Sequence, residues 1–109
     1  MKKLYRVRKN EEFSKIISQR HSFSSGNFVM YVCDKTEANA RVGISVSKKL
    51  GNAVNRNRIK RQLREMIRAL VDFENCGKDM IIIVRTPFLN CSYQENLANL
   101  EKLIKKAII

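Results

Sequence analysis

The residues of this sequence that are most able to do chemistry are cations gathered between positions 48 and 68. This segment holds eight lysines and arginines but only one acid, Glu65, so it carries +7 of the net charge of +12 for all 109 residues. A guanidinium group can grip a phosphate through two parallel hydrogen bonds, whereas an ammonium group acts as a point charge. The mixture predicts a surface that binds a polyanion, and a folded nucleic acid suits it.

The apolar residues of the same segment recur at helical spacing. They predict an amphipathic helix over residues 53–73 whose buried stripe is formed by Ile59, Leu63, Met66, Ile67 and Leu70. One edge of the stripe carries cations at intervals of four residues, namely Arg56, Lys60, Arg64 and Arg68. The side of the helix opposite the stripe is polar as well and carries Asn57, Arg58, Arg61 and Glu65. Like charges at this spacing repel by a few tenths of a kcal/mol per pair. A phosphate-binding face therefore explains the row better than a merely solvated face.

Three uncharged residues in this segment also have the types that anion binding needs. Asn57 could orient the neighbouring arginines or read a base edge, although capping the start of the helix is an equally good role for it. Gly51 and Asn52 could form the turn that brings backbone N–H groups near an anion, as helix N-termini do. The glycine alone is a weak signal.

The triplet Arg56-Asn57-Arg58 and its flanks closely resemble the signature of the bacterial ribonuclease P protein subunit. Residues 45–54 precede the triplet and residues 59–65 follow it in the order of the family, without a gap. The resemblance extends to residues 9–13, 28–31 and 79–85, and so it covers nearly the whole chain. A signature of this length is highly specific.

Length and composition narrow the remaining possibilities. A chain of 109 residues with 44% hydrophobic residues can form one domain with a single core. No apolar stretch approaches the roughly 20 residues that span a bilayer, and the basic start of the chain has no signal-peptide core, so we expect a cytoplasmic protein. The chain has three cysteines, Cys33, Cys76 and Cys91, and no two of them form a C-x-x-C motif. Any disulfide would leave one cysteine unpaired, so the sequence argues against both a disulfide framework and a metal site.

Local patterns predict the other elements. Asn10 can cap a first helix, with Glu11 and Glu12 in its first turn and an apolar face formed by Phe13, Ile16 and Ile17. Residues 22–27 and 34–40 are typical of turns, and residues 28–33 and 41–47 are typical of strands. Residues 80–85 are apolar at every position but the last, which predicts a central strand buried on both faces. Ser92 and Glu95 form a capping box for a last helix with Leu97, Leu100, Leu103, Ile104, Ala107 and Ile108 facing inward.

These elements predict an α+β protein, a single two-layer domain over residues 1–109 in the order α-β-β-α-β-α. The resemblance adds what the pattern does not contain. It implies a third early strand, giving α-β-β-(β)-α-β-α, and a mixed sheet with an unusual left-handed β-α-β crossover, a ribosomal protein S5 domain 2-like fold. Ordinary chirality favours a right-handed crossover.

The residues that an independent nuclease would need do not gather anywhere in the sequence. The ten acids are scattered over helix starts, loops and element ends, so no cluster for a divalent metal is expected. His21 is the sole histidine and stands beside a serine-rich turn, where a surface role is far commoner than general-base catalysis. We therefore predict no catalytic residue, metal site or bound cofactor on this chain, and any chemistry must come from a partner.

The resemblance implies which partner that is. In ribonuclease P the RNA subunit performs Mg²⁺-dependent hydrolysis of precursor transfer RNA (tRNA), and the small protein assists. The catalytic RNA would be bound by Lys48, Lys49, Arg56, Asn57, Arg58 and Arg61. The single-stranded 5′ leader of the precursor would lie in a cleft between the first helix and the sheet, bound by Phe13, Ile17, Tyr31, Lys60 and Arg64. Ile17 departs from the family, in which an aromatic residue is common at this position.

Alternatives remain open for the cleft and for the function. Phe13 and Ile17, four residues apart on a helix, are also an ordinary core pair, and the ring of Tyr31 could pack inward with its hydroxyl at the edge. A ribosomal protein or a general RNA chaperone would share the size and charge. A DNA-binding protein fits less well, because its recognition helix normally sits in a compact helical module and this basic helix lies between strands.

Overall fold

The computed structural model describes residues 2–108, which form three α-helices, four strands and three short 3₁₀ turns. The elements follow in the order η1 (Lys3–Tyr5), α1 (Asn10–Ser18), β1 (Ser22–Ser24), β2 (Phe28–Asp34), β3 (Val42–Ser45), η2 (Lys48–Leu50), α2 (Ala53–Leu70), β4 (Lys78–Val84), η3 (Thr86–Asn90) and α3 (Tyr93–Ile108). This is the predicted α+β order, with the third early strand that the resemblance implied. Within residues 2–108, no helix has the length and apolar character needed to cross a membrane.

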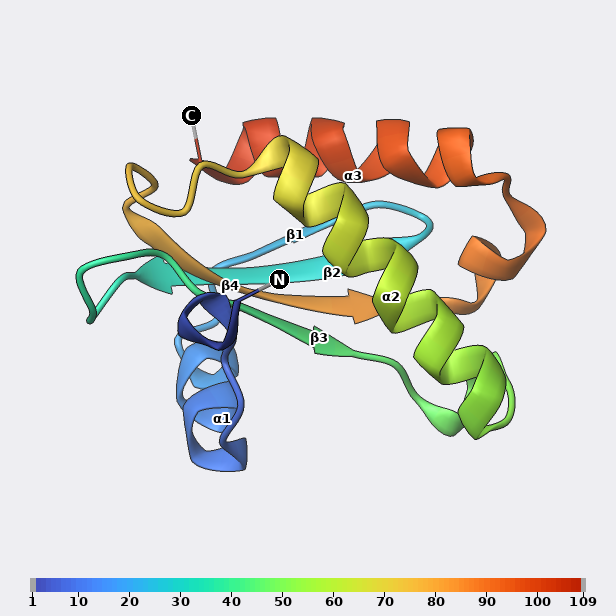
Figure 1. The fold of residues 1–109 in the computed structure, drawn as a ribbon, viewed down its shortest axis with the longest axis horizontal. Helices are drawn as coiled ribbons and strands as arrows, with labels where there is room; N and C mark the ends of the chain where they lie inside the picture. The colour runs from blue at the N-terminus through green and yellow to red at the C-terminus, as the bar shows by residue number, and fades with distance from the viewer. Residues whose placement is uncertain (1, 109) are drawn as a thin grey trace.

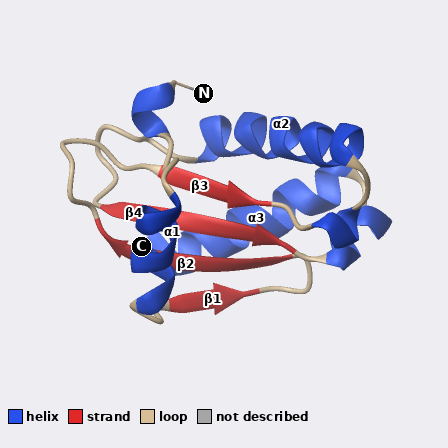
Figure 2. Cartoon of the chain, turned by 90° about the horizontal axis from the view of Figure 1, so that it is seen from below, coloured by secondary structure: helices blue, strands red, loops and turns tan. Residues whose placement is uncertain are grey.

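The four strands form one mixed sheet in the order β1-β2-β4-β3. Strand β2 is antiparallel to β1 and β4, whereas β3 is parallel to β4. Helices α2 and α3 cover one face of the sheet, and α1 lies against the other (Figure 1). Seen from the side of α1, β3 and β4 run in the same direction with α2 beyond the sheet, so the β3–α2–β4 crossover is left-handed (Figure 2). The left-handed crossover that the resemblance implied is therefore confirmed, although most β-α-β crossovers are right-handed.

The main core lies between the sheet and helices α2 and α3. Alternate residues of the strands point into it, because successive side chains of a strand face opposite sides. Ile59, Leu63, Met66 and Ile67 of the predicted stripe are buried there, and Leu70 packs at its margin. Met80, Ile81 and Ile82 of β4 have no exposed surface, which confirms that this strand is central and buried on both faces. The Ser92–Glu95 capping box at α3 is also confirmed by two reciprocal hydrogen bonds.

The structure corrects three local predictions. Residues 22–24 are a strand rather than part of a turn, because they pair with β2 along its outer edge. Helix α2 ends at Leu70 instead of residue 73, and the ring of Phe73 stacks on Tyr5 with 4.4 Å between the centroids. Helix α1 begins at Asn10 itself, so the cap position falls on Lys9, whose side chain makes no capping hydrogen bond.

An ion-pair network fastens α1 to the sheet. Arg41, just before β3, donates a hydrogen bond from Nη1 to Glu12 of α1 and one from Nη2 to Oδ2 of Asp79, at 3.2 Å. Asp79 also accepts the backbone N–H of Arg41 at Oδ1, at 2.9 Å. The side chain of Asp79 is only 1% exposed and that of Arg41 is 13% exposed. Most of this network is therefore shielded from water, and it fixes where α1 crosses the sheet.

Candidate nucleic-acid interface

The cations predicted to bind the catalytic RNA lie along η2 and the first half of α2. Lys48, Lys49, Asn57, Arg58 and Arg61 are exposed, and Arg56 is half-buried. Among residues 2–108, none of these cations has a carboxylate oxygen within 4.0 Å. The buried Nε of Arg56 has no hydrogen-bond partner among these residues either. An unsatisfied buried donor costs free energy, so an anion that arrives from outside would stabilise this end of the helix.

The start of α2 is built by Gly51 and Asn52, as the sequence predicted. Gly51 has a φ of 126°, a left-handed backbone conformation that favours glycine. The side chain of Asn52 is the helix cap and accepts the backbone N–H of Asn55 at 2.9 Å. The alternative role of Asn57 as the cap is therefore wrong, because it lies inside the helix, with its side chain exposed. That position leaves the amide of Asn57 accessible to a partner.

The sheet face on the side of α1 is only partly covered. Helix α1 crosses one end of the strands, and among residues 2–108 no helix lies over the other end of this face (Figure 2). Phe13, Ile17, Tyr31 and Ile83 are half-buried and pack against a small cluster formed by Val7, Ile16, Cys33 and Ile81. The core-pair interpretation of Phe13 and Ile17 is thus correct in part. Each of these side chains nevertheless keeps accessible surface.

Gly43 is what allows Phe13 to lie so close to the sheet. A Cβ atom at position 43 would stand 2.6 Å from Cζ of Phe13 and 2.7 Å from Cδ1 of Ile81, much closer than real Cβ contacts. The ring of Phe13 therefore rests directly on the backbone of β3. The backbone of Gly43 is not left-handed, so the effect of a larger residue here would be steric: the ends of the Phe13 and Ile81 side chains would have to move.

We expect Gly43→Ala to displace the ring of Phe13 and to lower the free energy of unfolding by about 1–3 kcal/mol, the usual cost of overpacking. Urea unfolding of the purified protein would measure this loss. Gly26→Ala is the matched control, because a Cβ atom there meets nothing within 4 Å. Equal unfolding midpoints for the two variants would show that the approach of Phe13 to β3 is not tight.

Two of the predicted leader-binding cations lie at the margin of this face. Lys60 and Arg64 of α2 line one hollow together with Phe13 of α1. Ile17 of α1 and Tyr31 of β2 do not line that hollow and pack against the small cluster between α1 and the sheet. Burial, followed by the positive charge of Arg6, lowers the pKa of the Arg64 guanidinium. The structure thus joins residues of α1 and α2 that are about fifty positions apart in the sequence.

Sequence reasoning missed two cations of the same margin. Arg6 and Arg8 precede α1, and both line the hollow with Lys60 and Arg64. Arg6 forms a parallel bridge with Val42, so this part of the chain lies along the outer edge of β3. The signal was the alternation Tyr5-Arg6-Val7-Arg8, which is typical of an extended edge segment with one basic side.

The fold and its charged surface define a small basic α+β protein, and comparison with known proteins specifies the family. The family model described as Ribonuclease P matches residues 1–108. The ribonuclease P protein component of Bacillus cereus strain AH187 is 44% identical over 108 residues, covering 98% of this chain and 94% of that protein. That of Bacillus anthracis strain CDC 684 is 44% identical over 108 residues, covering 98% and 91%.

Comparison with solved structures indicates the same family. The Staphylococcus aureus RNase P protein superimposes with a TM-score of 0.84 at 40% identity, covering 94% of each chain. The Thermotoga maritima RNase P protein superimposes with a TM-score of 0.79 at 27% identity, covering 93% of this chain and 96% of the other. The chain therefore belongs to the ribonuclease P protein family. Members of this family are protein subunits of an RNA–protein endoribonuclease of tRNA 5′ processing.

Proposed function

We propose that this chain binds two RNAs and thereby promotes removal of the 5′ leader from precursor tRNA by the catalytic RNA of ribonuclease P. The observation that carries the proposal is that α2 holds cations with no carboxylate within 4.0 Å among residues 2–108, and that two of them lie beside the half-buried ring of Phe13, which packs with Tyr31 on one face of the sheet. One surface is suited to a folded RNA and the other to a single strand. The protein would work in the cytoplasm, where we expect it to be located.

The first surface binds the catalytic RNA through Lys48, Lys49, Arg56, Asn57, Arg58 and Arg61. Five of these side chains are exposed and Arg56 is half-buried, and none of the cations has an acid partner within residues 2–108, which supports this assignment. Phosphates of the RNA would replace the missing carboxylates as counter-charges, and each contact would release condensed cations from the RNA. Repulsion among the cations of α2 would fall at the same time.

The second surface binds the 5′ leader in the cleft between α1 and the sheet. The rings of Phe13 and Tyr31 stack on unpaired bases. Lys60 and Arg64 bind the phosphates of the strand, which are the same for every sequence. Every base has a face that can stack, so this arrangement tolerates different leader sequences. With Ile17 in place of an aromatic residue, we expect one stacking surface fewer.

In this proposal the RNA performs the phosphodiester hydrolysis and binds the Mg²⁺ that the reaction needs. This chain contributes positive charge between the two RNAs and positions the leader. Its cations lower the repulsion between the phosphates of two RNAs that must approach each other, and its cleft holds the leader. No catalytic residue is assigned to the protein.

Arg58→Ala should weaken binding to the catalytic RNA, and the slope of log affinity against log salt concentration should become smaller by about one, because one phosphate contact is lost. Arg58 is exposed and has no acid partner among the described residues, so its removal should leave the fold intact. Filter binding over a series of potassium concentrations would measure both quantities. Lys102→Ala, an exposed cation of α3, is the control. Unchanged affinity and slope would remove Arg58 from the RNA-binding surface.

The function itself is tested by 5′ processing of a precursor tRNA with a bacterial ribonuclease P RNA at low magnesium concentration, with and without this protein. We expect strong stimulation by the protein and no cleavage by the protein alone. Absence of stimulation would favour a general RNA chaperone. Cleavage without the RNA subunit would overturn the assignment of the chemistry to RNA.

A further inference from the structure

The first residues of the described chain form a fastened element, which we call the strap (residues 2–8). The ring of Tyr5 stacks on Phe73 in the loop after α2, and its hydroxyl donates a hydrogen bond to Oε1 of Glu74 at 2.5 Å. Nδ2 of Asn39 donates to the carbonyl oxygen of Leu4 at 3.0 Å. The backbone N–H of Val7 donates to the carbonyl oxygen of Val42 at 3.1 Å. Contacts with three other segments of the chain therefore hold the strap against the edge of the sheet.

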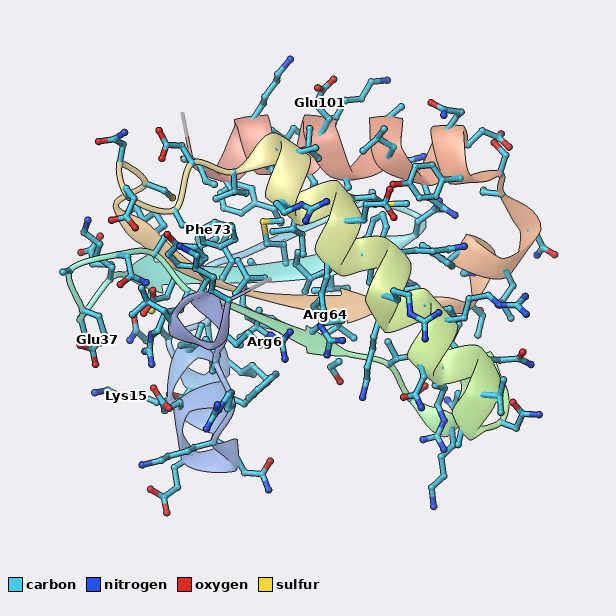
Figure 3. All side chains as sticks on the ribbon, in the orientation of Figure 1. Arg6, Lys15, Glu37, Arg64, Phe73 and Glu101 are labelled. Carbon is cyan, nitrogen blue, oxygen red and sulfur yellow. The ribbon has the colours of Figure 1, made fainter. Side chains whose placement is uncertain are left out.

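The strap brings Arg6 against the basic helix. Figure 3 shows the side chains of Arg6 and Arg64 side by side, between the first turn of the chain and α2. Arg6 lines a hollow of about 330 Å³ with three more arginines and one acid, all from α2: Arg61, Arg64, Glu65 and Arg68. A water molecule takes about 30 Å³ of liquid volume, so the hollow can admit a phosphate group.

The charges in this hollow are unbalanced. Four guanidinium groups face a single carboxylate, and the charge of Arg6 contributes to the lowered pKa of Arg64 after burial. Arg61, Arg64 and Arg68 are spaced three and four residues apart, which places them on one side of the helix. The strap adds a fourth cation to a row that already repels itself. An anion in the hollow would convert this repulsion into attraction.

We propose that this hollow binds a backbone phosphate of RNA, with Arg6 of the strap and Arg68 joining Arg61 and Arg64 as its ligands. The inference rests on the proposed function and extends it in two respects. It adds two phosphate ligands, and it makes the strap an RNA-binding element that the Tyr5–Phe73 stack holds in position. The hollow lies between a cation assigned to the catalytic RNA, Arg61, and one assigned to the leader, Arg64. Either RNA could therefore supply the phosphate.

The test uses the full chain with Arg6→Gln and Arg68→Gln, each compared with Lys102→Gln. Lys102 lines a different hollow with Ser24, the last residue of β1, and with Ser25 after it, at the opposite edge of the sheet. The first arm measures binding of each variant to the catalytic RNA over a series of salt concentrations. The second measures the affinity of the assembled enzyme for precursor tRNA with an eight-nucleotide leader and with a one-nucleotide leader.

We expect Arg6→Gln and Arg68→Gln to lose affinity by a factor on the order of ten, with a salt slope smaller by about one. Loss in the first arm assigns the phosphate to the catalytic RNA, and loss only with the long leader assigns it to the leader. Tyr5→Leu keeps all four arginines but removes the ring stack on Phe73 and the hydrogen bond to Glu74, so it should weaken RNA binding in the same arm as Arg6→Gln. Thermal unfolding of each variant would verify that it is folded under the conditions of the assay.

The inference is overturned if Arg6→Gln and Arg68→Gln match Lys102→Gln in both arms while Arg58→Ala still weakens RNA binding. The proposed function would then stand without this phosphate site. If Arg58→Ala is also without effect, the proposed RNA-binding surface of α2 fails together with the inference. The two failures are therefore distinguishable within one set of measurements.

Discussion

Replacing Asp79 with asparagine should lower the free energy of unfolding by roughly 3–5 kcal/mol, the usual cost of breaking a buried ion pair from one side. Asp79 is 1% exposed, and it holds both the backbone N–H and the guanidinium of Arg41. An asparagine could still accept the backbone N–H. Its NH₂ group would instead face the guanidinium donors, and Arg41 would lose one of its two acidic partners.

Asp34→Asn is the matched control for this measurement. Asp34 also pairs with a cation, Lys78, but its side chain is 88% exposed, so the same substitution should cost less than about 1 kcal/mol. Urea unfolding followed by circular dichroism would compare the two variants. Similar losses for both would mean that burial of the Arg41–Asp79 pair does not govern its contribution.

Tyr31→Ala should reduce the affinity of the assembled enzyme for precursor tRNA by a factor of roughly 5–150, because base–aromatic stacking contributes about 1–3 kcal/mol per base. Mature tRNA has no leader, so its binding should change little. Tyr31 lies on the sheet face beside α1 and keeps accessible surface. Equilibrium binding of precursor and mature tRNA to the same holoenzyme preparation would measure the difference.

Tyr31→Phe is the control for the ring itself. It retains the stacking surface and removes only the hydroxyl, so precursor binding should stay close to that of the unaltered protein. Tyr31 also packs against the small cluster beneath α1, and the unfolding midpoint of Tyr31→Ala must therefore be determined as well. Equal losses for precursor and mature tRNA would indicate misfolding or a different path for the leader.

The sequence predicted those parts of the fold that are governed by local pattern. The stripe of α2, the apolar run of β4 and the Ser92–Glu95 box each depend on residues that are close in the chain, and all three are confirmed. Strand β1 could not be predicted in this way. Residues 22–24 form a strand because Tyr31, Met30 and Val29 of β2 pair with them, whereas their own composition is typical of a turn.

The end of α2 shows the same limit. Phe73 continues the apolar pattern of the helix, yet its ring stacks on Tyr5, which lies far away near the start of the sequence. The candidate site was predictable where its residues belong to one helix, as on α2. Arg6 was missed because only tertiary structure brings the strap beside Arg64. The handedness of the crossover came from the family resemblance, since periodicity carries no information about it.

The strand order has a consequence for how the chain acquires its structure during synthesis. Among the four described strands, β3 pairs with β4, and β2 pairs with the other edge of β4. Because β4 follows α2 in the chain, the ribosome releases the basic helix before the central strand of the sheet exists. Until residues 78–84 emerge, the apolar stripe of α2 has no complete core to cover, and its cations are already exposed to the RNA-rich surroundings of the ribosome. Nascent chains truncated before and after β4 would therefore differ sharply in protease resistance.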